Sequence, residues 1–166
     1  SSVRLWLSSL DSYKSTDVIY IDFAKAFDTV SHTKLLHKLK SYGIRNKLID
    51  WIGAWLSGRT QSVKLGNIFS SFKAVLSGVL QGSVLGPLLF LLFINDLCDN
   101  ISSDAHPTLF ADDLKIFSDQ TPTPAHSSPG HVRSSLLQDS LDIIFSWSTL
   151  WQLQISFPKC SVLSIS

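Results

Sequence analysis

Three aspartates lie at the ends of short apolar segments. Asp22 closes one such segment, and the adjacent pair Asp112-Asp113 separates two others. Adjacent carboxylates repel each other, because unit charges about 4 Å apart interact at roughly 4 kcal/mol in a partly shielded protein environment. Mg²⁺ converts this repulsion into coordination, since hard cations take oxygen ligands and leave room for phosphate oxygens. The chemistry that these residues could do is therefore metal-assisted phosphoryl or nucleotidyl transfer.

A simpler interpretation of Asp112 and Asp113 is a tight turn, because Asp favours turns through bonds to its own backbone. Taken alone, the pair is most simply explained in that way, and the metal interpretation depends on Asp22. The sequence contains no Walker loop, HExxH helix or GxSxG elbow. Positioning and charge, which dominate phosphoryl transfer, would then do most of the catalysis.

Two predicted elements must bring these acids together. A continuous apolar stretch predicts a buried strand over 17–23, ending at the Asp22 carboxylate. Residues 108–117 predict a hairpin with the acidic pair at its turn. If both lie side by side in one sheet, the three carboxylates converge at one end. We expect the Asp22 and Asp112 carboxylates within about 6 Å of each other, close enough to share two metal ions.

Helical patterns with start and stop signals account for much of the remaining chain. A glycine-punctuated loop is expected over 77–83 and a proline-rich loop over 119–131. Elements alternate without a regular βαβ series, so we expect an α+β fold, an antiparallel sheet with helices on one face. The other predicted elements are helix 33–42 (capped by Ser31), helix 46–56, a hairpin over 59–76 that turns at Gly66-Asn67, an apolar helix with Pro87 in its first turn that runs through Leu97, helix 132–150, and strands 153–155 and 161–165. Helix 46–56 is expected to bury Leu48, Ile49, Trp51, Ile52 and Trp55.

Composition fits one globular domain. Apolar residues make up 45% and charged residues 16% of 166 positions, which argues against disorder. Between Phe23 and Val75 there are nine basic and two acidic residues, whereas the segment from Leu76 onward has three basic and eight acidic ones. This division suits a polyanion track beside a metal site. For the lysines of helix 33–42 a solvated helix face is an equal alternative; these are Lys34, Lys38 and Lys40.

The sequence has no methionine, which predicts a fragment or a processed piece of a longer protein. Cys98 and Cys160 have no zinc-type spacing and follow no signal peptide, so we expect a reducing intracellular compartment. Residues 84–94 are nearly all apolar, yet a bilayer needs about 20 such residues. We therefore expect a buried core helix there and no membrane partner.

Four segments resemble, in order, motifs A, B, C and D of reverse transcriptases. They are residues 22–30, 77–87 and 110–113, then Trp151 with Lys159-Cys160. The long second motif and residues 55–61 are similar to the LINE-type (non-LTR retrotransposon) branch. The resemblance covers the chain almost end to end. It implies a right-hand polymerase palm with adjoining fingers elements and no thumb, so that 1–166 would be a partial reverse transcriptase domain.

The resemblance also implies roles for individual residues. Asp22 and Asp112 would bridge two Mg²⁺ ions (Mn²⁺ could substitute), with the Phe23 carbonyl as a further ligand and Asp113 as a supporting carboxylate. Lys159 would be the general acid near the pyrophosphate, although a solvated lysine explains it equally well.

On the substrate side, the resemblance implies that Phe27 excludes a ribose 2′-hydroxyl; a core aromatic is the alternative, and the two uses can coexist. Gln81 and Gly82 would line the incoming nucleotide and the template. The implied partners are an RNA template, a DNA primer, dNTPs and the fingers and thumb of the parent polyprotein. The implied location is the nucleus during integration, although no targeting signal is visible. For Arg59 and Gln61 the resemblance suggests no role beyond a structural one.

Three positions depart from the family pattern. Proline is usual at Leu80, asparagine at Ser156, and tyrosine at Phe110. Leu80 would loosen a loop that proline stiffens by fixing φ. An inactive remnant that keeps only the fold or nucleic-acid binding is therefore an alternative function. A metal-dependent nuclease would use similar carboxylates but would not account for Phe27 or the second motif.

Overall fold

The computed structural model describes residues 16–119 and 129–165, and the chain divides into two compact units. The described part of unit one comprises residues 16–24, 96–119, 129–150 and 154–165. Unit two comprises residues 25–95 and 151–153.

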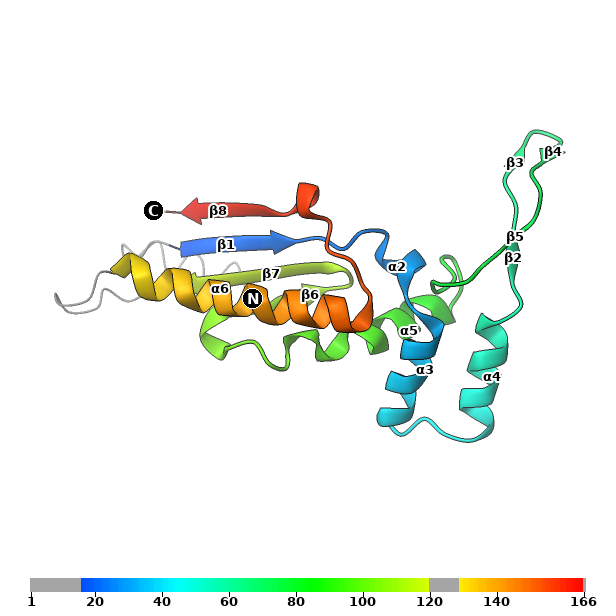
Figure 1. Cartoon of the computed structure of the whole chain (residues 1–166), viewed down its shortest axis with the longest axis horizontal. Helices are drawn as coiled ribbons and strands as arrows, with labels where there is room; N and C mark the ends of the chain where they lie inside the picture. The colour runs from blue at the N-terminus through cyan, green and yellow to red at the C-terminus, as the bar shows by residue number, and fades with distance from the viewer. Residues whose placement is uncertain (1–15, 120–128, 166) are drawn as a thin grey trace. The chain divides into compact units, whose positions relative to one another are not determined.

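Unit one is built on a four-stranded antiparallel sheet in the order β6-β7-β1-β8 (Figure 1). The strands are β1 (Thr16–Ile21), β6 (Thr108–Phe110), β7 (Asp113–Asp119) and β8 (Ser161–Ile165). Central β1 places Ile19 opposite Ile116 on one side and Val162 on the other. The expected antiparallel sheet and the buried strand before Asp22 are confirmed. An uninterrupted apolar stretch suits a strand that lies between two neighbours, as β1 does.

The acidic hairpin is shifted by one residue from the prediction. Phe110 pairs with Asp113, so Ala111 and Asp112 form the turn and Asp113 begins β7. Ala111 has a φ of 52°, whereas Asp112 is not among the residues with a positive φ, and a positive φ at the first central residue alone is the mark of a type II′ hairpin turn. The prediction that both aspartates occupy the turn was therefore wrong. The right-handed twist of the strands favours this two-residue loop.

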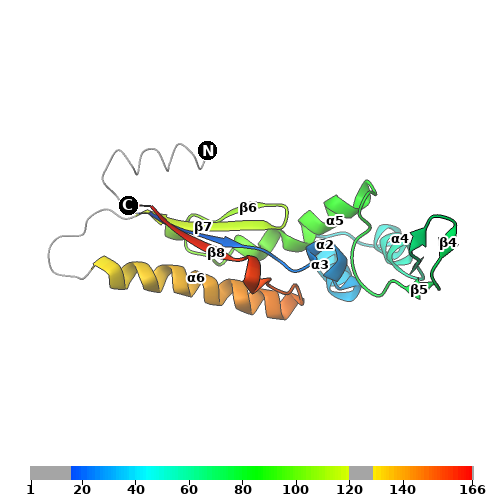
Figure 2. The ribbon, with the colours of Figure 1, turned by 90° about the horizontal axis from the view of Figure 1, so that it is seen from above.

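Helix α6 (Pro129–Trp151) runs along one face of the sheet (Figure 2). Its Ile144 and Trp147 are buried, and the Trp147 ring packs against Phe23 with centroids 6.4 Å apart. Trp147 Nε1 also donates a 3.0 Å hydrogen bond to Asp96. Two short 3₁₀ helices, η1 (Asn95–Cys98) and η2 (Ser103–Ala105), precede β6.

The loop predicted over 119–131 was wrong at both ends. Asp119 is the last residue of β7, and α6 begins at Pro129. Proline is tolerated in the first turn of a helix, where its missing N–H has no partner to lose. The middle of that loop prediction, residues 120–128, lies outside the described residues.

The predicted strand over 153–155 is also absent. Only Ile155 forms a β-bridge, to Phe23, and the chain then turns through η3 (Phe157–Lys159) into β8. β8 itself is confirmed. A single bridged residue pair is too short to form a ladder, so the segment is not a strand.

Unit two contains helices α2 (Ala26–Thr29), α3 (His32–Ser41), α4 (Lys47–Leu56) and α5 (Leu85–Ile94), together with the hairpin over 59–76. The predicted helices are confirmed with shifted ends, and Ser31 precedes α3 without a side-chain capping bond. On α4 the buried residues are Ile49, Ile52 and Leu56, whereas Leu48 and Trp51, expected inside, are more than half exposed. An amphipathic helix buries only the stripe of side chains that faces the core. On α4 this stripe contains some of the apolar residues, and the others face away from the core.

Lys38 on α3 is 2% exposed, so the solvated-face alternative is wrong for this lysine. Its ammonium donates a 2.6 Å hydrogen bond to the Phe93 carbonyl and lies 3.7 Å from the centroid of the Trp151 ring. A buried cation needs such partners, because desolvation of an unpaired charge is expensive. Lys40, two residues further, is exposed.

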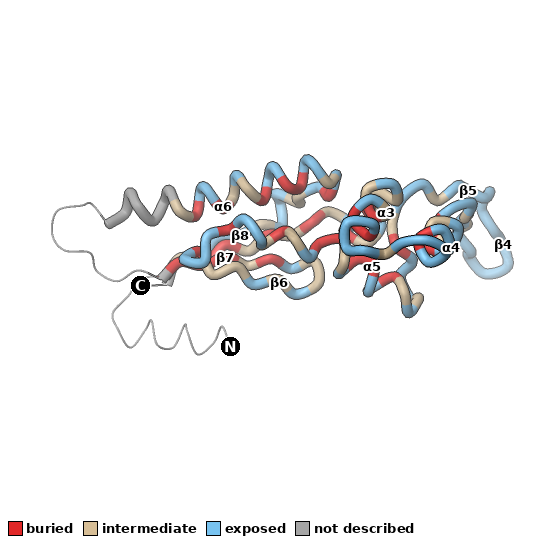
Figure 3. Tube along the Cα trace, turned by 90° about the horizontal axis from the view of Figure 1, so that it is seen from below, coloured by how far each residue is buried: buried red, intermediate tan, exposed pale blue. Residues whose placement is uncertain are grey.

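The hairpin over 59–76 consists of two short ribbons. β2 (Thr60–Gln61) pairs with β5 (Lys73–Ala74), and β3 (Lys64–Leu65) pairs with β4 (Ile68–Phe69). The turn at Gly66-Asn67 is confirmed. All four strands are exposed (Figure 3).

No helix within residues 16–119 and 129–165 has both the length and the hydropathy of a membrane-crossing segment. The apolar stretch near residue 90 forms α5, of which Leu89, Phe90 and Phe93 are buried. It is a core helix, as predicted.

Candidate functional site

The predicted site residues fall into two groups. Unit one holds Asp22, Phe23, Asp112, Asp113 and Lys159. Unit two holds the predicted substrate residues Phe27, Gln81 and Gly82.

Asp22 follows directly on β1, and its carboxylate is paired with a lysine. Lys159 Nζ lies 3.2 Å from Asp22 Oδ2, and their side chains are 68% and 23% exposed, respectively. Asp22 Oδ2 is itself buried and accepts no hydrogen bond, so the contact is an ion pair without hydrogen-bond geometry. Exposure of the lysine limits its stabilising effect to well below that of a buried pair.

The segment around η3 places Lys159 beside Asp22. The Ser156 amide donates a 2.8 Å hydrogen bond to the Asp22 carbonyl, and the Ala24 amide donates one of 2.7 Å to the Gln154 carbonyl. These two bonds flank the bridge between Phe23 and Ile155. Phe23 itself is 1% exposed, and its carbonyl takes part in neither bond. Ser156 acts through its backbone, so replacement of the usual asparagine leaves this contact possible.

The acidic hairpin meets the same end of the sheet. Ile21 is the cross-strand partner of Leu114, so Asp22 comes directly after one member of this pair and Asp113 directly before the other. Asp112 occupies the hairpin turn next to Asp113. The fold thus brings the backbone positions of the three aspartates to the same end of the adjacent strands β1 and β7. The predicted 6 Å separation of Asp22 and Asp112 stays a prediction.

The donor chemistry at this end of the sheet suits Mg²⁺. Carboxylate and carbonyl oxygens are its preferred protein ligands, and the buried Asp22 Oδ2 lacks a hydrogen-bond donor. Among the residues that the structure describes, no three His, Cys, Asp or Glu side chains are grouped as a metal-binding set. In this arrangement the Lys159 ammonium is the cation beside Asp22.

In unit two, loop 77–82 is fastened to the segment after Asp22. The Gly78 amide donates to the Val30 carbonyl and the Val79 amide to the Phe27 carbonyl, each over 2.8 Å. Gly78 has a φ of +91°, and an added Cβ would lie 2.7 Å from the Asp28 carbonyl oxygen. Only glycine combines this backbone conformation with so close an approach.

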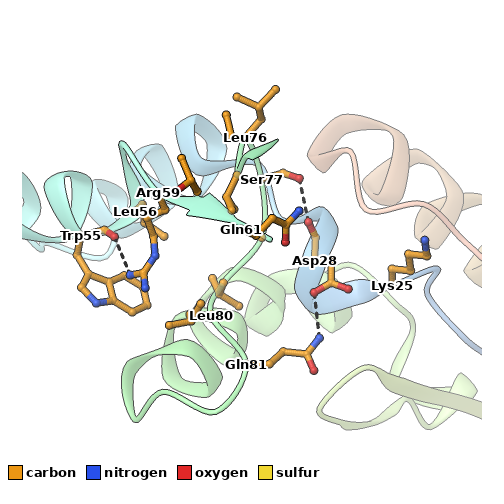
Figure 4. A pocket seen from close by; sticks show the side chains of 15 residues that line it. Lys25, Asp28, Trp55, Leu56, Arg59, Gln61, Leu76, Ser77, Leu80 and Gln81 are labelled. Atoms are coloured by element: carbon orange, nitrogen blue, oxygen red, sulfur yellow. Dashed lines mark hydrogen bonds between the residues drawn. The ribbon is translucent and has the colours of Figure 1, made fainter. Parts of the chain in front are cut away.

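Asp28 organises this loop, a role that the sequence pattern did not predict. Its Oδ1 accepts a 3.0 Å hydrogen bond from Gln81 Nε2, and its carbonyl accepts one of 2.8 Å from the Ser77 hydroxyl (Figure 4). A carboxylate only accepts, so the Gln81 amide must turn its nitrogen toward Asp28. The available sequence signal was the position of Asp28 inside the first motif, six residues after Asp22.

Phe27 and Gly82 have different surroundings. The half-buried Phe27 ring stacks on Phe90 of α5, with centroids 4.2 Å apart and planes 22° apart. Phe27 is therefore partly a core aromatic, as the alternative interpretation held. Gly82 has a φ of +81° and no atom within 4 Å of a Cβ built on it.

A pocket of about 660 Å³ lies over loop 77–81 in unit two (Figure 4). Its polar lining includes Lys25, Asp28, Arg59, Gln61 and Gln81. Cations, a carboxylate and amides around apolar walls suit a polar, anionic ligand with hydrogen-bonding edges. Leu80, where the family usually has proline, is 42% exposed and also lines this pocket.

A family model described as reverse transcriptase (RNA-dependent DNA polymerase) matches residues 7–165. The RNA-directed DNA polymerases from mobile element jockey of Drosophila funebris and Drosophila melanogaster are 29% and 30% identical, over 165 and 162 residues. Each match covers 96% of this chain and 17% of the relative. The Pol polyprotein from type-2 retrotransposable element R2DM of Drosophila melanogaster is 30% identical over 163 residues, 92% of this chain and 14% of that protein.

Solved structures with a similar fold include two yeast telomerases. Telomerase from Candida tropicalis, in complex with a fragment of telomeric RNA, matches with a TM-score of 0.68 and 12% identity, over 98% of this chain and 29% of the telomerase. The telomerase from Candida albicans matches with a TM-score of 0.64 and 12% identity, over 98% and 30% of the two chains. At such identity the likeness concerns the fold, and it confirms the expected α+β class.

Proposed function

Because the chain belongs to the reverse transcriptase family, we propose that it carries the polymerising centre of an RNA-directed DNA polymerase from a LINE-type retrotransposon. The enzyme would add dNTPs to the 3′-hydroxyl of a DNA primer on an RNA template. The observation that supports this proposal is the strand register, in which Asp22 follows the last residue of β1 and Asp113 precedes its partner Leu114 on β7, with Asp112 in the adjoining turn.

Asp22, Asp112, Asp113 and the Phe23 carbonyl would hold two Mg²⁺ ions. The ions would supply Lewis-acid stabilisation of the charge that develops in nucleotidyl transfer. In the reaction the primer 3′-oxygen would form a bond to the α-phosphorus, its proton would pass to solvent water, and the bond to pyrophosphate would break. Lys159, which now neutralises Asp22, carries the proton that the departing pyrophosphate would accept.

In unit two the proposed roles are positioning and selection. The Phe27 ring would exclude a ribose 2′-hydroxyl, a role compatible with its half-buried stacking on Phe90. Gln81 and Gly82 would line the nucleotide and the template strand. Copying a template into a chromosome would require the polymerase to act in the nucleus.

The test is primer extension with Mg²⁺, comparing this chain with a polypeptide of the parent element extended on both sides. We expect the extended polypeptide to incorporate labelled dNTPs on an RNA template, and we expect its Asp112→Asn variant to lose this incorporation. Incorporation that Asp112→Asn leaves intact would contradict the proposal. A parent polypeptide that binds template and primer without extending them would instead support the inactive remnant, and cleavage of the template would support the nuclease.

A further inference from the structure

The hairpin over 59–76 takes no part in the chemistry proposed above. Its apolar side chains are unusually exposed: Phe69 is 58% and Phe72 is 72% exposed. Val63, Leu65 and Ile68 are each at least 73% exposed. A group of exposed large apolar residues usually marks a binding surface.

The charge of this region has one sign. Between Asp50 and Asp96 the sequence contains no acidic residue, and its charged residues are Arg59, Lys64 and Lys73. All three belong to the hairpin. An approaching polyanion would therefore meet attraction from this stretch of the chain without local repulsion.

The two faces of the hairpin differ in chemistry. Lys64 and Phe69 are cross-strand partners, and the Lys64 ammonium lies 5.4 Å from the centroid of the Phe69 ring. Leu65 pairs with Ile68. Cross-strand partners lie on the same face and successive residues on opposite faces, so in the β3–β4 ribbon one face is cationic and aromatic and the other is aliphatic.

The base of the hairpin is continuous with the pocket in the same unit. Arg59, Gln61 and Ala74 belong to the hairpin and also line the pocket. The Arg59 guanidinium lies 5.2 Å from the centroid of the Trp55 ring, a second pairing of cation and aromatic ring. A strand bound in the pocket could therefore continue along the hairpin.

We propose that this hairpin is a binding platform for single-stranded nucleic acid. Bases stack on the exposed rings of Phe69 and Phe72, and Lys64 and Lys73 bind the phosphates. Every base has a π-face, so such a platform accepts any sequence. The uniform positive charge favours this ligand over a protein partner, which would use the aliphatic face. The inference concerns binding alone and does not rest on polymerisation.

Fluorescence anisotropy of the chain with a labelled 12-nucleotide oligouridylate, at several KCl concentrations, tests the proposal. We expect the double variant Phe69→Ala/Phe72→Ala to bind about tenfold more weakly or worse, with an unchanged salt dependence. Lys64→Gln/Lys73→Gln should reduce the slope of log affinity against log salt by about 1.4, since each phosphate contact contributes about 0.7. The matched control, Leu65→Ala/Ile68→Ala on the aliphatic face, should bind like the wild type.

Circular dichroism establishes whether the variants fold. We expect all of them to fold, because the substituted side chains are exposed. Wild-type affinity for the phenylalanine variant would overturn the proposal, as would equal losses in the aliphatic control. Failure of the wild-type chain to bind, or equal affinity for duplex RNA, would overturn it too. Absence of primer extension by the parent polypeptide would contradict the proposed polymerase function. It would not affect the proposal that the hairpin binds single-stranded nucleic acid.

Discussion

The side-chain amide of Gln81 donates a 3.0 Å hydrogen bond to Oδ1 of Asp28, and this bond fixes which end of the amide is free. Because the nitrogen faces Asp28, the Gln81 oxygen remains as an acceptor for a ligand in the pocket. Asp28 thereby becomes a positioning residue for a side chain in the proposed nucleotide site.

We expect Asp28→Ala to free the Gln81 amide without unfolding the protein. Both side chains are exposed, so the free energy of unfolding should change by no more than about 0.5 kcal/mol. The Gln81 side-chain ¹H–¹⁵N resonances should move, as NMR can measure. Asp50→Ala, which removes an exposed acid on α4, is the control and should leave them in place. Unmoved Gln81 resonances in Asp28→Ala would contradict the role of Asp28.

Gly78→Ala should destabilise unit two by about 2 kcal/mol or more, because a positive φ and a clash with the backbone act together. The new Cβ would lie 2.7 to 2.9 Å from three backbone atoms of Asp28. Gly82→Ala, with a similar φ but open space around its Cβ, serves as the control for backbone strain alone. Urea unfolding should rank Gly78→Ala well below Gly82→Ala; equal stabilities would exclude the close approach.

Lys159→Gln should raise the affinity for a divalent cation several-fold, because no ammonium then competes at Asp22. Mn²⁺ binding followed by electron paramagnetic resonance measures this without any need for catalysis. Stability should change by less than about 1 kcal/mol, as for other solvent-exposed ion pairs. Lys40→Gln, on the exposed side of α3, controls for the change in net charge. Unchanged or weaker Mn²⁺ binding by Lys159→Gln would count against Asp22 as a ligand.

Lys38→Met should lower the free energy of unfolding by about 1 to 3 kcal/mol, because methionine keeps the stem but loses a charged hydrogen bond and a cation–π contact. Lys40→Met on the same helix should change stability little. Thermal or urea unfolding gives both values. A Lys38→Met variant as stable as Lys40→Met would show that packing of the stem alone matters.

Burial raises the pKa of the Cys98 thiol, and the neighbouring Asp99 carboxylate raises it further. The thiolate is the nucleophile, so alkylation of Cys98 by iodoacetamide at pH 8 should be slower than that of an unhindered cysteine. Asp99→Asn should lower the pKa and speed the reaction. Because the pKa of Cys98 is raised, the alkylation rate should continue to increase at pH values above those at which an ordinary cysteine is already fully ionised. Mass spectrometry of the Cys98 peptide against time follows all three effects.

The sequence alone determined helices α3, α4 and α5 of unit two, strand β1 and the position of Asp22 at its end. These features follow from local periodicity and from residues that end an element, such as Asp22 after a continuous apolar segment. It also predicted the hairpin at Asp112 and Asp113, but shifted by one residue. The shift arose because cross-strand pairing of Phe110 with Asp113, which a linear pattern does not contain, sets the turn.

Only the tertiary structure decided which side chains meet. The ion pair of Asp22 with Lys159 and the bond of Asp28 with Gln81 join residues far apart in sequence. The burial of Lys38 depends in the same way on Phe93 and Trp151. Hydrophobic periodicity predicts which face of an element is buried, but long-range polar contacts depend on the packing of whole elements, and no local pattern encodes them.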